Sequence, residues 1–179
     1  MQSKDHLVWL DLEMTGLDPE IHGILELGCV ITNSQLQIVA EMPCLVIAQP
    51  ADVMARMDPW CVQQHGRSGL LERVEKSGIS LPEAEQRTLD FLRQYCFEKT
   101  SPLCGNSIGQ DRRFLHQYMP RLNGFFHYRN IDVSSIKELV NRWYPLELQA
   151  PAKNKTHHVS DDIRESIEEL KHYRRVVFK

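Results

Sequence analysis

The hydrophobic pattern opens with three apolar segments separated by short polar breaks. Residues 7–14, 24–33 and 36–48 have the composition of successive strands, and the polar residues Asn33, Ser34 and Gln35 predict a short turn between the last two. This order predicts a β-meander. Residues 52–64 are then expected to form a helix.

The second half of the chain alternates between helical and extended patterns. Ser80 is a candidate N-cap, and Glu83 completes a capping box at the start of a helix that continues to about residue 96. Strands are expected at 101–105 and 125–133, and helices at 110–118, 134–144 and 159–176. Strands first, and alternating helices and strands later, predict an α/β fold: a mixed sheet flanked by helices.

Length and composition are those of one soluble globular domain spanning residues 1–179. Hydrophobic residues make up 42% of the chain, charged residues 25%, and no apolar run approaches the length of a membrane span. The N-terminus shows no export or organelle signal. Five scattered cysteines exclude CxxC zinc or redox spacing and predict reduced thiols, so we expect a cytoplasmic protein.

The net charge of −3 limits the kind of nucleic acid that this chain could bind. Proteins that bind long nucleic acids usually carry a basic excess, because neutralising many phosphates supplies their affinity. No such excess is present here. A nucleic-acid substrate would therefore contact the protein through only a few phosphates.

Two carboxylates stand at the end of the first apolar strand. Asp11 and Glu13 are two residues apart, so their side chains project to the same side of a strand, ~7 Å apart along the chain. Like charges at this place repel each other and are costly to desolvate. A second pair, Asp18 and Glu20, reads as a solvated turn. The strand-end position of the first pair favours a binding site.

Further acidic residues stand at expected helix starts. Asp111 lies in the first turn of a helix that follows a strand, and Asp161 and Asp162 open the final helix, where the helix dipole alone explains acidic residues. His157 and His158 precede them and could act as a general base near neutral pH. Together these oxygen-rich side chains suit a hard divalent cation rather than zinc. Two such ions ~4 Å apart can hydrolyse a phosphodiester.

Four motifs in this order and spacing resemble those of the oligoribonuclease family. They are WLDLEMTGLDP at 9–19, CGNSIGQDRRFL at 104–115, YRNIDVSSIKEL at 128–139 and THHVSDDIRESI at 156–167. The resemblance covers residues 7–178 and implies a DEDDh-type 3′-to-5′ exoribonuclease on a ribonuclease-H-like fold. Such an enzyme degrades very short RNA, from dinucleotides to about pentamers, to nucleoside 5′-monophosphates and completes RNA turnover.

The resemblance also assigns the metal site of this hydrolase, which would hold two Mg²⁺ or Mn²⁺ ions. The family's metal ligands correspond to Asp11, Glu13, Asp111 and Asp162. The general base, five positions before the last aspartate, corresponds to His157. If the segment were fully helical, His158 would lie only ~40° from Asp162 and His157 ~140° away. Motif position selects His157, and His158 stays as the reserve.

Three positions match residues that hold bases in the family. Leu17 matches an apolar wedge between two bases, and Trp60 and His65 match residues that pack around the 3′ nucleotide. Stacking of a base on an aromatic ring is worth ~1–3 kcal/mol and tolerates any base. Without the resemblance, Trp60 would read as a helix-start residue packed on the core.

Four further positions match residues around the 5′ end of the substrate. Ser107 and Ser134 match residues that contact the terminal 5′ phosphate, and relatives form homodimers in which Tyr128 and Arg129 reach the partner's site. This arrangement would exclude longer chains and agrees with the acidic net charge. Two alternatives stay open: an exonuclease of the same chemistry that trims longer RNA or DNA, and a catalytically silent nucleotide-binding module.

Overall fold

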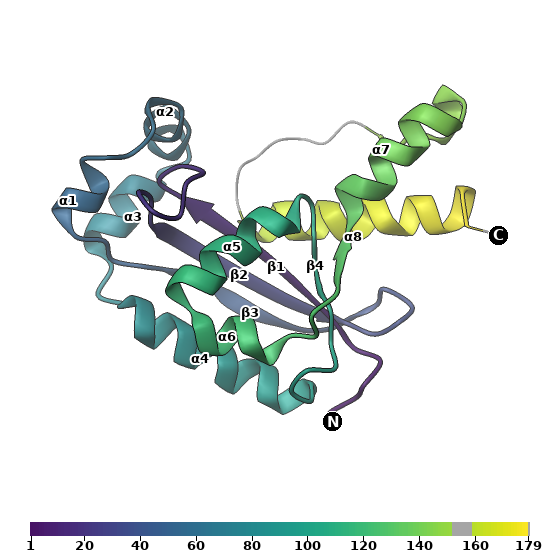
Figure 1. Cartoon of the computed structure of the whole chain (residues 1–179), viewed down its shortest axis with the longest axis horizontal. Coiled ribbons are helices and arrows are strands. Elements are labelled where there is room, and N and C mark those ends of the chain that lie inside the picture. Colours follow the sequence, from purple (N-terminus) through teal and green to yellow (C-terminus); the bar gives the residue numbers. More distant parts are fainter. Residues whose placement is uncertain (152–158, 179) are drawn as a thin grey trace.

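The computed structural model describes residues 1–151 and 159–178. Within these ranges the strands form one sheet in the order β3-β2-β1-β4-β5 (Figure 1). β1 (Leu7–Met14), β2 (Ile24–Thr32) and β3 (Ile38–Val46) pair antiparallel, whereas β4 (Leu103–Gly105) and β5 (Asn130–Asp132) pair in parallel beyond β1. The predicted meander and the mixed sheet are confirmed.

The helices predicted from residue 81 onward are confirmed, whereas the short helices over 120–125 and 146–148 were not predicted. The helices are α1 (Ala51–Met54), α2 (Pro59–Arg67), α3 (Leu70–Lys76), α4 (Leu81–Tyr95), α5 (Ile108–Tyr118), α6 (Pro120–Phe125), α7 (Val133–Trp143), η1 (Leu146–Leu148) and α8 (Val159–Val176). Ser80 caps α4, since its hydroxyl accepts from the Glu83 N–H at 3.3 Å. Among the described residues, no helix is both long and apolar enough to cross a bilayer.

Two predicted elements are wrong. The helix expected over 52–64 is broken between Met54 and Pro59, because a proline disfavours the helical conformation of the residue before it. Asp58 is accordingly extended, and its carboxylate accepts from the Trp60 N–H at 2.8 Å as the N-cap of α2. The α3 helix was not predicted.

The strand expected over 125–133 is also much shorter in the structure. Only residues 130–132 pair in the sheet, and Phe125 ends α6 instead. Phe125 and Phe126 are both buried and pack in the core against α4 and α5. The apolar run therefore reflects core packing rather than strand pairing.

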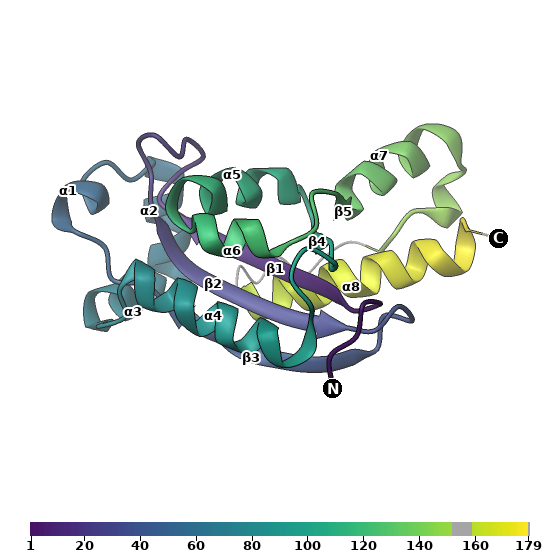
Figure 2. The same ribbon diagram turned by 60° about the horizontal axis from the view of Figure 1, so that its bottom comes forward.

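The two faces of the sheet are covered by different helices. Helices α4, α5 and α6 lie on one side of the sheet and α8 on the other (Figure 2). Leu10 and Leu12 of β1 pack in the larger core with α4, α5 and α6, whereas Trp9 packs on the opposite face with residues of α7 and α8. Side chains alternate along a strand, so Asp11 and Glu13 share the face of Trp9. Both carboxylates therefore project toward α8.

A glycine on β2 allows α8 to lie close to the sheet beside these carboxylates. Gly28 pairs with Asp11 across the β1–β2 ladder. A Cβ atom at this position would lie 2.2 Å from Val159 Cγ1 and 3.0 Å from Ile163 Cδ1, both on α8. The missing side chain thus makes room for the first turns of α8, which carry Asp162.

Candidate active site

Three of the four predicted metal ligands meet at the end of β1. Carboxylate oxygens of Asp11, Glu13 and Asp162 all lie within 4.8 Å of one another, and each residue is partly buried. The strand contributes two of them, and the first turn of α8 contributes the third. Oxygen ligands at this spacing suit a hard divalent cation such as Mg²⁺ or Mn²⁺.

The fourth predicted ligand lies beside this group but is not one of the three. Asp111, in the first turn of α5, is buried, and its Oδ1 accepts from the Leu12 N–H at 3.0 Å. Leu12 is the residue between Asp11 and Glu13. Burial raises the pKa of Asp111 to about 7, although the N–H group of Leu12 lowers it in part.

Crowding of carboxylates dominates the electrostatics of the site. Burial, followed by the charges of the nearby carboxylates Asp162, Glu26 and Asp111, raises the pKa of Glu13 to about 8, although Arg73 opposes this rise. A carboxylate with such a raised pKa binds a proton tightly when no cation is near. Divalent cations would supply the missing positive charge, so the residues present fit a metal site.

Glu26 and Arg73 were not predicted as part of this site. Glu26 pairs with Glu13 across the β1–β2 ladder, is buried, and forms an ion pair with Arg73 of α3. A carboxylate inside the apolar segment 24–32 was the signal that could have found Glu26. Nothing in the local sequence pointed to Arg73, because α3 itself was not predicted.

The structure places His65 next to the acidic group. His65 is buried on α2, and its Nε2 lies 2.9 Å from the Met14 carbonyl oxygen, so this nitrogen carries the hydrogen. Its Nδ1 lies 3.8 Å from Glu13 Oε2. His65 is therefore held by the end of β1 within reach of a group bound at the carboxylates.

Leu17 and Trp60 line one pocket beside the acidic group. These residues are 70% and 57% exposed, so both are accessible to a ligand. The pocket has a volume of about 730 Å³, and Asp18, His22 and Arg113 also line it. An open apolar pocket with a cationic residue suits a nucleobase and its phosphate.

The two predicted phosphate-contacting serines also meet, although they are far apart in sequence. Ser107 follows β4 and Ser134 opens α7, and their hydroxyl oxygens lie 3.2 Å apart. The Ser107 N–H donates to Ser134 Oγ at 2.9 Å and to Asp132 Oδ1 at 3.0 Å. Because β1, β4 and β5 run parallel, their carboxyl ends place this serine pair and the acidic group at one edge of the sheet.

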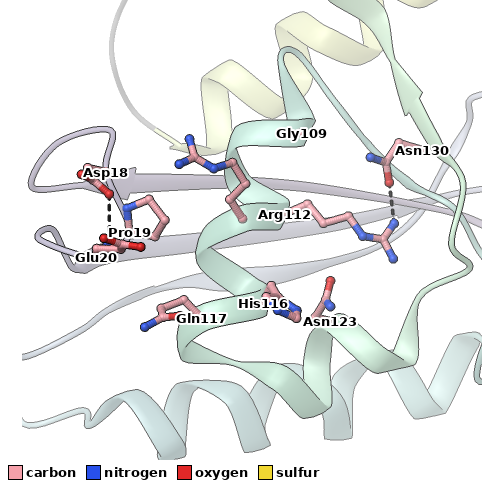
Figure 3. Close-up of a pocket in the computed structure, with 10 residues that line it drawn as sticks. Asp18, Pro19, Glu20, Gly109, Arg112, His116, Gln117, Asn123 and Asn130 are labelled. Carbon is pink, nitrogen blue, oxygen red and sulfur yellow. Dashed lines mark hydrogen bonds between the residues drawn. The ribbon is translucent and has the colours of Figure 1, made fainter.

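Tyr128 and Arg129 lie on the surface just before β5. Tyr128 is 72% exposed, and the Arg129 guanidinium lies 5.2 Å from the centre of its ring. Arg112 of α5 holds this segment, since it donates to the His127 carbonyl at 3.0 Å and to the Asn130 side chain (Figure 3). Sequence reasoning did not identify Arg112.

The predicted general base lies outside the described residues, as does its reserve, because both His157 and His158 fall in 152–158. A second pocket of about 500 Å³ lies on the outer side of α5, lined among others by Arg112, His116 and Asn123 (Figure 3). Among the described residues, none of those predicted for the site lines this pocket.

The fold is shared with known exonucleases. A product-bound exonuclease I structure superposes with a TM-score of 0.74 at 13% identity, covering 98% of this chain and 44% of that chain. Exonuclease I from Methylocaldum szegediense gives a TM-score of 0.73 at 16% identity, and the match covers 97% of this chain and 41% of that chain. The chain thus spans less than half of those proteins, and the likeness establishes a ribonuclease-H-like fold. A family model described as "Exonuclease" matches residues 8–170, which defines the class.

Full-length relatives narrow this class. A protein named oligoribonuclease from Marinobacter nauticus is 56% identical to this chain. The alignment spans 179 residues and covers 100% of this chain and 99% of the relative. A second protein named oligoribonuclease, from Vibrio cholerae, is 55% identical over 177 residues, which cover 99% of this chain and 98% of the relative. The chain belongs to the oligoribonuclease family of exonucleases. It is a hydrolytic, divalent-metal-dependent 3′-to-5′ exoribonuclease that acts on short RNA.

Proposed function

We propose that the acidic group at the end of β1 hydrolyses the 3′-terminal phosphodiester of very short RNA, from dinucleotides to about pentamers. The products would be nucleoside 5′-monophosphates. The observation that carries this proposal is the approach of Asp11, Glu13 and Asp162 oxygens within 4.8 Å, beside a buried Asp111. Two Mg²⁺ or Mn²⁺ ions held there would activate a water and stabilise the leaving oxygen.

The chain's own residues would then orient the substrate and move one proton. His157 takes the proton of the attacking water by its motif position, with His158 as the reserve. His65 donates its Nε2 hydrogen to Met14, so its ring is fixed beside Glu13 and packs against the 3′ nucleotide. The fixed ring of His65 would help to keep the reacting atoms in line.

Preference for short RNA would come from two holding points at one edge of the sheet. Leu17 and Trp60 line an open pocket in which a base can stack on an aromatic ring without regard to sequence. The pair formed by Ser107 and Ser134 would hold a 5′ phosphate. A substrate held at both points would need only a few phosphate contacts, which agrees with a chain of net charge −3.

We further propose that the enzyme acts as a homodimer in the cytoplasm, where it serves RNA degradation. Tyr128 and Arg129 lie on the surface, where a second copy could receive them. Leu139 and Trp143, one helical turn apart on α7, are 42% and 69% exposed and provide an apolar surface for that copy. All five cysteines are free thiols, in keeping with a reducing compartment.

Degradation of a 5′-phosphorylated diribonucleotide, compared with a twenty-nucleotide strand of the same bases, tests the substrate. Both reactions are run with Mn²⁺ and with EDTA. Metal-dependent hydrolysis that strongly favours the dinucleotide supports the proposal. Equal or faster hydrolysis of the longer strand would leave the metal chemistry and refute the short-substrate preference. A folded, metal-loaded protein that cleaves neither would be a silent binding module.

Mixing two inactive variants tests whether the partner supplies Arg129. Asp11→Ala and Arg129→Ala proteins are combined and their subunits allowed to exchange. If Arg129 acts in the partner's site, each mixed dimer has one intact site, and about a quarter of wild-type activity returns. If Arg129 acts in its own subunit, both sites of a mixed dimer stay defective and no activity returns.

A further inference from the structure

A continuous hydrogen-bond network connects the pair Ser107 and Ser134 with side chains of α8, and Asn106 lies at its centre. Asn106 follows the last residue of β4 and is half-buried. Its Oδ1 accepts from Ser134 Oγ at 3.0 Å. Its Nδ2 donates to Ser166 Oγ at 2.7 Å and to Glu169 Oε2 at 3.3 Å. Every polar atom of the amide therefore has a partner.

Groups on α8 determine which way this amide points. Glu169 is buried, and its other oxygen accepts from the Tyr173 hydroxyl at 3.2 Å and lies 3.6 Å from Lys137 Nζ. An ionised carboxylate can only accept, so the NH₂ group of Asn106 must face α8. The Ser166 hydroxyl already donates to the Asp162 carbonyl at 2.8 Å, so its oxygen is left to accept from the same NH₂.

The amide orientation in turn decides where the serine protons point. With Asn106 Oδ1 facing Ser134, the Ser134 hydroxyl hydrogen is directed toward Asn106. Ser134 Oγ then presents lone pairs to Ser107, whose N–H donates to it at 2.9 Å. The Ser107 hydroxyl keeps its hydrogen, which can turn from Ser134 to a ligand. A phosphate oxygen accepts hydrogen bonds and needs such a donor.

We propose that Asn106 is a positioning residue that fixes the Ser134 hydroxyl and so makes Ser107 the hydroxyl donor to the substrate's 5′ phosphate. The proposal rests on the proposed function, in which the serine pair holds that phosphate. It assigns the two serines unequal roles: Ser107 donates to the phosphate, and Ser134 orients Ser107. Neither role follows from the presence of two serines alone.

Steady-state kinetics on two diribonucleotides test this proposal, one with a 5′ phosphate and one without it. Asn106→Ala is expected to raise KM for the phosphorylated dinucleotide about tenfold, as expected when a charge-assisted hydrogen bond is lost. KM for the other dinucleotide and kcat for both should stay near wild type. Ser166→Ala removes only one of the two hydrogen bonds that the Asn106 NH₂ group donates. It should therefore raise KM for the phosphorylated dinucleotide by a smaller factor. Thermal unfolding confirms that each variant is folded.

Asn33→Ala is the matched control, because its side chain accepts from two backbone N–H groups in the turn between β2 and β3, away from the site. It should alter stability without altering the preference for the 5′ phosphate. A folded Asn106→Ala protein that keeps the full preference, or loses activity equally on both dinucleotides, overturns the proposal. If the wild-type protein shows no preference for the 5′ phosphate, then Ser107 and Ser134 do not hold that phosphate. In this case the proposed function, and not only the role of Asn106, is wrong.

Discussion

Replacing one proposed metal ligand should stabilise the metal-free protein. In Glu13→Gln, an amide of nearly the same shape replaces a carboxylate whose pKa lies at about 8. The pKa is high because the group is buried and because Asp162, Glu26 and Asp111 repel its charge. The amide carries no charge, so above pH 8 the variant avoids this repulsion.

The size of the effect follows from linkage between protonation and folding. The folded pKa exceeds the ordinary value of 4.5, so the native state holds a proton that the unfolded chain releases between pH 4.5 and about 8. Stability from this group is complete below pH 4.5 and is lost as the pH rises through 8. At about 1.4 kcal/mol per pKa unit, ionising Glu13 costs several kcal/mol.

Part of this gain is offset in the variant. The amide is itself a buried polar group, and leaving it without a good partner costs on the order of 1–3 kcal/mol. A net stabilisation of about 2 kcal/mol is therefore expected above pH 8, which raises Tm by roughly 4–8 °C in a chain of this size. At pH 4.5, where folded Glu13 is protonated and the repulsion is absent, only the cost of the buried amide remains, so the variant should unfold at a lower temperature than wild type.

Thermal unfolding by circular dichroism in EDTA and in Mn²⁺ checks this prediction. Glu20→Gln is the control, because it makes the same change at an exposed carboxylate. A cation at a hundred times its Kd stabilises wild type by about 2.7 kcal/mol, and the variant should lose most of this gain. If Glu13→Gln is less stable than wild type in EDTA above pH 8, the inferred repulsion is absent and the reasoning is refuted.

Further changes test other parts of the molecule. Asp162→Ala should stay folded and lose more than about nine-tenths of its turnover in Mn²⁺, because it removes one of the three carboxylates that lie close enough to share a cation. Asp161→Ala should retain most of its turnover, and retained activity in Asp162→Ala would exclude the metal assignment. Trp60→Ala should raise KM roughly tenfold or more while leaving Tm nearly unchanged, and an unaltered KM would exclude base stacking there. Gly28→Ala should cost about 1–3 kcal/mol in urea unfolding and weaken Mn²⁺ binding, because its Cβ displaces α8; undisturbed binding would contradict that placement. Glu85→Ala should lower the free energy of unfolding by about 3 kcal/mol, because this buried carboxylate accepts from the first N–H groups of α6. The kcat/KM of the folded enzyme should stay unchanged.

Periodic patterns predicted well wherever one face of an element is buried. The helices α4, α5, α7 and α8 were predicted near their observed positions, because a period of 3.6 records which face meets the core. The strand β2 is buried at all nine positions and was recognised as a continuous apolar run. Two short helices and one apolar run were not predicted correctly. α1 and α3 are too short to show a period, and the buried Phe125 and Phe126 gave an apolar run that pattern alone cannot separate from a strand.

In the acidic site, too, the residues placed by local structure were predicted and those placed by tertiary packing were missed. Asp11 and Glu13 were predicted to share one side of a strand, and their oxygens do lie together with Asp162. Strand alternation is local, so the sequence contains it. Glu26 and Arg73 were missed because their role depends on strand register and on a helix that packs from elsewhere.

The sequence by itself therefore determined the order of elements, the strand-end position of two carboxylates and, through four motifs, the family. Only the tertiary structure decided that Gly28 makes room for α8, that Asn106 links Ser134 to Glu169, and that Arg112 holds the segment of Tyr128. These contacts join residues that are distant in the chain. Local periodicity reports which face is buried, but it does not report which partner covers it, because that choice is made by packing of the whole chain.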